Sequence, residues 1–381
     1  MKSNHLARNI TVFTIFLAFM GMGVVDPILP TIVKSFGASH WQVEMLFTSY
    51  ILMMAFMMLP AGIFAAKYGD KLIMTIGLAF VSLFAILCSF STSIFDLALY
   101  RAGWGLSNSL FFATALIVLI TLSNEYHKAV GLFEGAIGFG ISAGPLLGGF
   151  LGEHSWRYPF FATGILTFCS FLAILIFVKV PKKIDKRKTI KWDDLKMLFS
   201  NKKFLLISFS AMFYYYGFFV ILAYSPLVVI FTPLEMGFLF FAWGLALAFG
   251  SIYVSTKLEQ KWKVKNIVPF SILIFSFLLF LMMEAESKNL MSIFIILCGL
   301  LSGVNSSLMT SYVMEVNFEK NIISGGFNFL RWLGAGVAPV LSGYLAGIFN
   351  NSHLPFLVGS IFSIFAFLLL MLAKSSKREY L

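Results

Sequence analysis

Charged residues are scarce in this sequence, and the scarcity bounds what the chain can be. Asp, Glu, Lys and Arg together make up 12% of its 381 residues. A soluble chain uses about a quarter of its residues in this way. Hydrophobic residues fill 59% of the sequence, and 45 residues are Phe. So little charge excludes an ordinary soluble domain, and we predict an integral membrane protein.

Cysteines are few in this sequence, and a phosphate-binding motif is absent from it. The three cysteines, Cys88, Cys169 and Cys298, each lie in a separate apolar run. Their spacing excludes a disulfide framework and a cysteine metal site. The sequence has no Gly-x-x-x-x-Gly-Lys-Ser/Thr motif, which excludes a phosphate-binding loop of the ATPase kind. We therefore expect no metal, no cofactor, no enzymatic activity and no drive by ATP.

Acidic residues are few beside basic ones, which gives a formal net charge of +11. The basic residues occupy short loops between apolar runs, a distribution typical of the positive-inside rule and not of a nucleic-acid partner. With a cytoplasmic N-terminus, 23 of the 28 Lys and Arg residues fall in cytoplasmic segments and 3 in outer ones. We therefore predict a multi-pass protein of the cell membrane with both termini cytoplasmic.

What the sequence does contain is a series of twelve apolar runs. A membrane-spanning helix needs about 20 such residues. The predicted spans are 9–33, 41–64, 72–92, 95–121, 129–152, 158–179, 204–231, 234–256, 266–284, 290–315, 322–349 and 353–373. A hydrophilic linker, residues 181–203, separates bundles at 1–180 and 204–381. Within it, Lys191 to Phe199 is predicted to form a short amphipathic helix on the membrane surface.

The two halves repeat each other. Aligning Pro145 with Pro339 also aligns glycines of the fifth and eleventh runs. The aligned pairs are Gly131 with Gly325, Gly140 with Gly334, and Gly149 with Gly343. Parallel repeats of six helices are known from transporters whose halves rock about a central site. The predicted fold class is an all-α integral membrane protein with twelve transmembrane helices in two pseudo-symmetric six-helix bundles.

A glycine face dominates the fifth run. Gly140, Gly144, Gly148 and Gly152 recur every fourth residue, and Pro145 favours a bend. In a bilayer, glycine lets two helix backbones approach closely, which favours their association. Two interpretations follow from this pattern. The face makes a tight structural crossing of two helices, or it serves as a hinge or seal at a pore.

Three stretches carry a family resemblance. Gly140-x-x-x-Gly144-Pro145-x-x-Gly148-Gly149 resembles the fifth-helix antiporter motif of major facilitator superfamily exporters. The loop from Gly62 through Gly69 to Lys71 resembles that family's loop between helices two and three. Arg101-x-x-x-Gly105 resembles its fourth-helix motif. The resemblance implies conformational roles for the glycines, Pro145 and Lys71. Ala66 and Asp70 depart from the family loop, which usually has an acid and a base there.

Charged residues inside the spans are the candidates for proton coupling, because a charge there is costly and usually faces a cavity or a partner. Counting about 1.5 Å per residue places both Asp26 and Arg101 in the outer part of the membrane. We therefore predict an Asp26–Arg101 pair, with an interfacial Asp26 as the alternative. Glu134 is the second candidate carboxylate, with an interfacial position near the cytoplasmic end of the fifth helix as its alternative.

Candidate cavity residues are Arg331 and a set of aromatic and amide residues, and the resemblance implies that the seventh helix, with its tyrosines, lines the cavity. Arg331 is about nine residues, or ~14 Å, into the eleventh run, with no acid at its level in the second half. It reaches either a carboxylate of the first half or an anionic group of the substrate. Aromatic and amide residues complete the predicted cavity, because aromatic walls suit flat amphipathic molecules. These residues are Tyr214, Tyr215, Tyr216, Tyr224, Asn108, Asn305 and Asn328.

The resemblance implies a monomeric exporter of amphipathic drugs or small organic molecules, driven by proton exchange and working by alternating access. Its expected partners are a small-molecule substrate, protons and the lipid bilayer. An exporter of a specific anionic metabolite or metal chelator is the alternative within transport. A non-transporting membrane receptor or scaffold is the alternative from another class, although the short loops leave little surface for protein partners.

Overall fold

A computed structural model of the chain describes residues 2–123, 126–179, 192–318 and 320–375. Every regular element in these ranges is helical. Twelve helices there are long and apolar enough to cross a membrane. The all-α fold class and the twelve spans predicted from the apolar runs are thereby confirmed.

Six spans come from the first half of the sequence. Their elements are α1 (Lys2–Gly23), η1 (Asp26–Ile28), α2 (Leu29–Phe36), α3 (His40–Tyr68), α4 (Asp70–Ser89), α5 (Ile94–Ser123), α6 (Tyr126–Gly152) and α7 (Arg157–Phe177). The elements that follow are α8 (Trp192–Ser200), α9 (Lys202–Phe219), η2 (Val220–Tyr224), η3 (Ser225–Leu227), α10 (Pro233–Phe249), η4 (Gly250–Val254), α11 (Ser255–Glu259), α12 (Val264–Met283), α13 (Lys288–Val313), α14 (Lys320–Phe349) and α15 (Leu354–Ser375).

The first span of each half is not one regular helix. In the first half, α1 ends at Gly23 and a 3-10 turn at Asp26–Ile28 leads into α2. In the second half, α9 passes into a π-helical turn and then a 3-10 turn at Ser225–Leu227. Pro27 and Pro226 occupy the second position of these 3-10 turns, where their missing backbone N–H interrupts the α-helical ladder. Both prolines lie inside continuous apolar runs, so the predicted spans did not separate these turns.

The chain forms two compact units. Unit 1 consists of Met1–Ala38, Ser49–Thr189 and Phe231–Gly244, and unit 2 of Ser39–Thr48, Ile190–Ile230 and Leu245–Leu381. Two short segments therefore pack with the half of the sequence to which they do not belong. The division predicted at residues 181–203 rests partly on residues 180–191, which lie outside the described residues.

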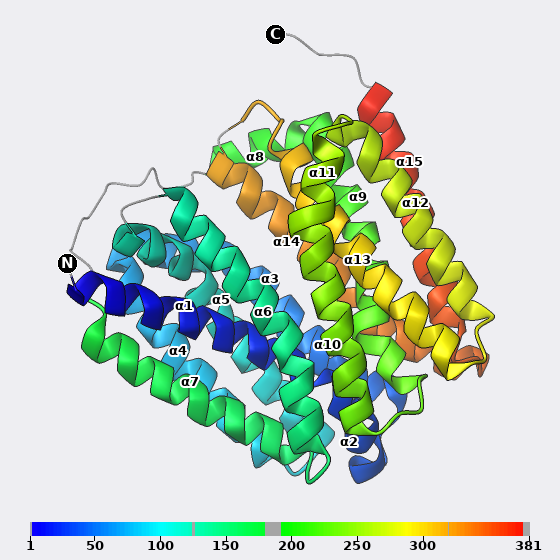
Figure 1. The fold of residues 1–381 in the computed structure, drawn as a ribbon, viewed down its shortest axis with the longest axis horizontal. Helices are drawn as coiled ribbons and strands as arrows, with labels where there is room; N and C mark the ends of the chain where they lie inside the picture. Colours follow the sequence, from blue (N-terminus) through cyan, green and yellow to red (C-terminus); the bar gives the residue numbers. More distant parts are fainter. Residues whose placement is uncertain (1, 124–125, 180–191, 319, 376–381) are drawn as a thin grey trace. The chain divides into compact units, whose positions relative to one another are not determined.

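Helix packing inside each unit repeats the predicted internal symmetry. In unit 1, α1 packs on α6 and on α7, and α4 packs on α5 and on α7 (Figure 1). In unit 2, α9 packs on α14 and on α15, and α12 packs on α13 and on α15. The first and fifth spans of a half are thus paired in both units, and so are its third and sixth spans.

Glycines at aligned positions make these corresponding crossings. A Cβ atom at Gly140 would lie 2.5 Å from the Phe16 carbonyl oxygen on α1. A Cβ atom at the aligned Gly334 would collide with the Met212 carbonyl oxygen on α9. Only a residue without a side chain permits such an approach of two backbones. The aligned glycines therefore make the same kind of close helix crossing in both halves of the sequence.

The two segments that pack with the other half are also held by aligned glycines. Gly149 of α6 lies against the backbone of Pro233 and Gly237 on α10, within unit 1. Gly343 of α14 lies against the backbone of Trp41 on α3, within unit 2. The amide of Val340 also donates to the Thr48 hydroxyl at 3.4 Å. Each unit therefore holds a short piece of the other half through close backbone contact.

We predict that Gly343→Ala destabilises the protein. The new Cβ would lie 2.7 Å from the Trp41 backbone, so the helices must separate, at a cost of about 1–3 kcal/mol for overpacking. Gly347→Ala, one turn further along α14, meets no atom within 4 Å and serves as the matched control. Melting curves in detergent compare the two variants. An equal melting temperature for both would contradict the role of the Gly343 crossing.

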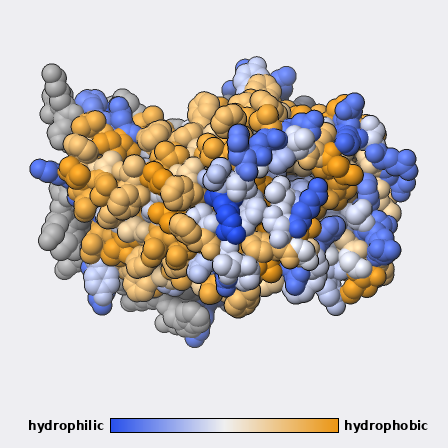
Figure 2. All heavy atoms as spheres, turned by 90° about the horizontal axis from the view of Figure 1, so that it is seen from below, coloured by the Kyte–Doolittle hydropathy of each residue, from blue (hydrophilic) through white to orange (hydrophobic). Residues whose placement is uncertain are grey.

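The helix faces that remain outside the packed cores are apolar. Phe95 and Phe139 are each at least 68% exposed, and many other large hydrophobic side chains are also exposed. Hydrophobic residues cover large parts of the face shown in Figure 2. Exposed apolar area of this extent is suited to contact with lipid chains and not with water.

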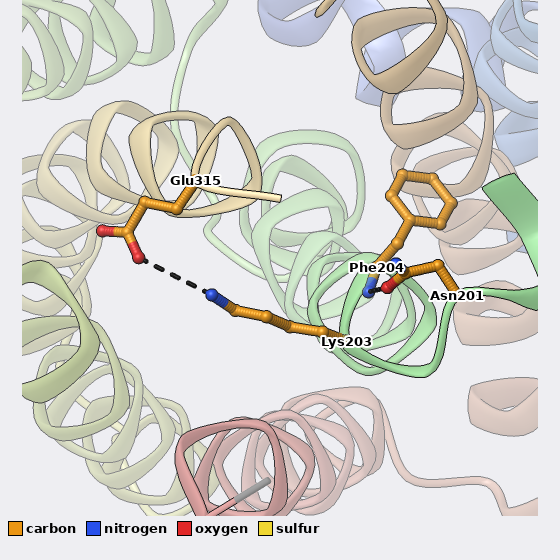
Figure 3. A network of polar contacts seen from close by, with 4 residues as sticks. All are labelled: Asn201, Lys203, Phe204 and Glu315. Atoms are coloured by element: carbon orange, nitrogen blue, oxygen red, sulfur yellow. Dashed lines mark hydrogen bonds and ion pairs between the residues drawn. The ribbon is translucent and has the colours of Figure 1, made fainter. Parts of the chain in front are cut away.

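The short helix predicted in the linker is observed as α8, at Trp192–Ser200. It ends just before Asn201, whose side chain caps α9 by accepting a hydrogen bond from the Phe204 amide at 2.9 Å (Figure 3). Leu198 of α8 is fully buried, while Met197 is exposed. The apolar face of α8 therefore packs in part on unit 2 itself.

Candidate functional site

Arg101 forms the centre of a buried cluster in unit 1. Its side chain on α5 is fully buried. The guanidinium carbon lies 4.3 Å from the centre of the Tyr50 ring and 5.0 Å from that of Trp104. Both rings are themselves fully buried. Cation–π attraction of this kind strengthens when water is removed, so the rings hold the guanidinium in place.

Asp26 is the buried acid of this cluster. It lies in the 3-10 turn η1, is 1% exposed, and interacts electrostatically with Arg101. Neither of its carboxylate oxygens accepts a hydrogen bond from another residue in the described part of the chain. The two residues that the sequence proposed as a pair therefore interact electrostatically, and their role in coupling stays a prediction.

Tyr50 and Trp104 were not among the residues predicted from the sequence, although Asn108 was. Asn108 is fully buried, and its side-chain amide donates a hydrogen bond to the Tyr50 hydroxyl. Asn108 therefore stabilises the ring that covers Arg101. Trp104 lies three residues after Arg101 on α5, so helical spacing could have identified it. Tyr50 comes from a different helix, and no local signal points to it.

The glycine face of α6 packs against the segment that carries Asp26. A Cβ atom at Gly144 would lie 2.5 Å from the Met20 carbonyl oxygen and 3.0 Å from the Gly23 Cα atom. Gly148 meets the carbonyl of Val24 and the ring of Pro27. The motif thus makes a tight crossing at the point where α1 is interrupted. Whether this crossing also acts as a hinge or seal stays a prediction.

The sequence also singled out Glu134, Gly62, Gly69 and Lys71. Glu134 belongs to α6, but its side chain lies outside the described residues. A Cβ atom at Gly62 or Gly69 would meet no atom within 4 Å, and Gly69 has a positive φ of 95° before α4. The Lys71 ammonium group donates a weak hydrogen bond of 3.4 Å to the Leu175 carbonyl. The conformational roles of Gly62, Gly69 and Lys71 still rest on the family resemblance.

The three successive tyrosines of α9 point to different neighbours. Tyr214 packs on Phe275 of α12, with 5.1 Å between ring centres. Tyr216 packs on Phe362 of α15, at 4.5 Å. Tyr215 instead pairs its hydroxyl with that of Ser306 at 3.1 Å. All three rings are buried, and each of them joins α9 to a different part of unit 2.

Arg331 lies beside the second of these tyrosines. Its guanidinium carbon is 4.8 Å from the centre of the Tyr215 ring, and the residue is partly buried. The Asn328 side chain, one turn earlier, donates to the Ser324 hydroxyl at 3.4 Å. Asn305 of α13 is fully buried. The Tyr224 hydroxyl donates a hydrogen bond to the Ser352 carbonyl at 3.0 Å.

Glu44 is a second buried acid, which was not predicted from the sequence. It lies one turn into α3, is fully buried, and interacts electrostatically with Tyr224 in unit 2. Its closeness to the end of an apolar run is typical of an ordinary interfacial residue. It is the one acid within the predicted span 41–64, and that property could have identified it.

Comparison with known proteins agrees with the fold and with the motifs. The sequence model of the Major Facilitator Superfamily matches residues 11–339. The multidrug efflux protein YfmO of Bacillus subtilis is 37% identical over 365 residues, which cover 95% of this chain and 91% of that protein. The quinolone resistance protein NorA of Staphylococcus aureus is 26% identical over 362 residues, covering 91% and 92%.

The fold is also found among solved structures. A bacterial homolog of the human lysosomal transporter Spinster superposes with a TM-score of 0.83 at 13% sequence identity, covering 97% of each chain. The family match spans most of the sequence, and one of its relatives is 37% identical over nearly the whole length. A multi-pass protein of the cell membrane, this chain belongs to the Major Facilitator Superfamily of transporters.

Proposed function

We propose that this chain exports amphipathic aromatic drugs from the cell in exchange for protons. Two relatives that align over nearly the whole chain are named for multidrug efflux and for quinolone resistance, which supports drug export. The absence of a phosphate-binding motif from the sequence favours a drive by an ion gradient. Transport follows alternating access, in which two pseudo-symmetric halves rock about a central site.

The observation that carries the proton coupling is the buried pair of Asp26 and Arg101. A carboxyl group out of water is costly as an anion unless it gains a proton or a cationic partner. At Asp26 both routes are available, because Arg101 stands nearby and the carboxylate oxygens accept no hydrogen bond from other described residues. A change in hydration therefore shifts the balance between the protonated acid and the ion pair.

This balance gives Asp26 the behaviour of a proton carrier. In the first half of the cycle, the group is open to the outer side and takes up a proton there. In the second, it is open to the cytoplasm, loses the proton, and is held as an anion by Arg101. In the second half of the sequence, Ser225 occupies the turn that corresponds to η1, so no carboxylate stands at that position.

The experiment uses purified protein in proteoliposomes loaded with a cationic dye and a pH-sensitive reporter. Imposing a pH gradient should drive the dye uphill, and dye movement should carry protons the opposite way. A receptor or scaffold would move neither. Dye movement without a matching proton flux would support a facilitator and contradict antiport.

Orientation and assembly belong to the same proposal. We place both termini in the cytoplasm, as the asymmetry of Lys and Arg indicates, and treat the monomer as the transporting unit. Labelling of single cysteines introduced at the two termini, from either side of the membrane, tests the orientation. Cross-linking in native membranes tests the monomer.

A further inference from the structure

Arg331 occupies an aromatic cluster in unit 2 formed with Tyr215, Phe327 and Trp332. Its guanidinium carbon lies 4.8 Å from the Tyr215 ring centre, 5.4 Å from that of Phe327 and 5.8 Å from that of Trp332. Eleven of the 30 residues of α14 precede it, which places it ~16 Å along the helix and well inside the span. The three rings contact the cation but offer no carboxylate to it.

Hydrogen-bond donors exceed acceptors in this cluster. The Nε atom of Arg331 and the Nε1 atom of Trp332 are both buried, and neither has a hydrogen-bond partner in the described residues. The hydroxyl groups of Tyr215 and Ser306 already pair with each other. Two donors that point to no acceptor are costly when buried, and a ligand with acceptor oxygens removes that cost.

The comparison with Arg101 shows what the second cluster lacks. Each arginine lies within a span against Tyr and Trp rings. Arg101 also interacts electrostatically with Asp26. No acid forms an ion pair with Arg331 in the described part of the chain; the ion pair found in unit 2 is that of Lys203 with Glu315, at 3.7 Å. A charged side chain at membrane depth commonly marks the path of a substrate.

We propose that Arg331 is the anchor for a carboxylate on the transported molecule. Building on the proposed function, this assigns the substrate class: flat aromatic molecules that carry a carboxylate, as organic anions or zwitterions. One carboxylate oxygen accepts from Nε and the other from a terminal N–H of the guanidinium, the geometry that favours arginine over lysine. The aromatic part of the molecule lies against Tyr215 and Trp332.

Two dyes with one ring system test the anchor. Rhodamine 110 has a free carboxylate, and rhodamine 123 is its methyl ester. Binding to purified protein in nanodiscs is followed by fluorescence polarisation. Arg331→Gln should weaken binding of rhodamine 110 about tenfold or more, which is the effect of losing a charge-assisted hydrogen bond, and should change rhodamine 123 less than about twofold. Arg331→Lys should fall between wild type and Arg331→Gln for the acid alone.

Lys203→Gln is the matched control. Lys203 is also a cation of unit 2 near an aromatic ring, 5.4 Å from the centre of Tyr312, but it already has Glu315 as its partner (Figure 3). Its removal should leave the binding of both dyes unchanged. Weakening by Lys203→Gln as large as that by Arg331→Gln would mean that overall charge, and not the anchor, attracts the carboxylate.

Other results also overturn the proposal. Equal loss of acid and ester in Arg331→Gln would mean that Arg331 supports the structure of the unit. Unchanged binding of the acid would remove Arg331 from the site, and no binding of rhodamine 110 by the wild-type protein would reject the substrate class. Gradient-driven efflux of rhodamine 123 is scored separately. Its success or failure decides the proposed drug export, whatever happens to the carboxylate.

Discussion

Asp26→Asn is expected to abolish uphill dye efflux driven by a pH gradient. The amide has nearly the shape of the protonated acid and cannot ionise, so it mimics a carrier that never releases its proton. Asp26 is buried, and its carboxylate oxygens accept no hydrogen bond from other described residues. Replacing one of these oxygens by an amide group therefore breaks no such hydrogen bond. The variant should therefore fold and bind substrate while losing the coupling step.

The measurement is efflux from membrane vesicles under an imposed pH gradient, beside exchange of labelled substrate without a gradient. For Asp26→Asn we expect uphill efflux near the background of empty vesicles and persistent downhill exchange. Glu259→Gln, which changes an exposed acid at the end of α11, should behave as wild type. Loss of both activities in Asp26→Asn would indicate a structural role for the acid.

Glu134→Gln separates the two candidate carboxylates. Full uphill efflux in Asp26→Asn together with loss in Glu134→Gln would transfer the coupling role to Glu134. Full activity in both variants would leave proton coupling without either of its proposed carriers. The proposal would then fail even if drug export itself were demonstrated.

Gly144→Leu is expected to abolish transport while the protein still reaches the membrane. A first side-chain atom at this position would lie 2.5 Å from the Met20 carbonyl oxygen and 3.0 Å from the Gly23 Cα atom, both in the backbone of α1. Backbone cannot rotate away as a flexible side chain can, so α1 and α6 must separate at a cost of about 1–3 kcal/mol or more. The separation would displace the turn that holds Asp26.

Gly135→Leu on the same helix is the matched control. No atom lies within 4 Å of a Cβ at that position, and replacing a helical glycine reduces the entropy lost on folding. Membrane insertion is measured by a fluorescent fusion and transport by dye efflux. We expect normal levels of both proteins and normal efflux in Gly135→Leu alone. Normal efflux in Gly144→Leu would show that the crossing tolerates separation.

Local pattern in the sequence was sufficient for the spans. Membrane thickness requires about 20 apolar residues per helix, so each span is readable without knowledge of its neighbours. The repeat of Gly140 and Gly149 at Gly334 and Gly343 could also be predicted from the sequence, because corresponding helices of the two halves have small residues at aligned positions. The similar depth of Asp26 and Arg101 was also predicted, since depth along a helix follows from counting residues, and the two residues do interact electrostatically.

Contacts between segments that are distant in the chain could not be predicted from the sequence. The sequence does not say that Tyr50 covers Arg101, or that Tyr215 and not Tyr216 lies beside Arg331. Such choices depend on how each helix is rotated about its axis, and an apolar helix in lipid carries no polar face that would fix this rotation. The tilt and rotation of a span are set by packing against its neighbours.

The sequence by itself determined the class of protein, the number of spans, the internal repeat and the charged residues available for coupling. Only the tertiary structure decided that Ser39–Thr48 and Phe231–Gly244 pack with the opposite half, that Glu44 is buried, and that Arg331 has aromatic neighbours but no ion pair with an acid among the described residues. The physical reason is that hydrophobicity fixes which residues enter the membrane. Close packing of backbones and buried charges, which joins residues far apart in the chain, decides what they meet there.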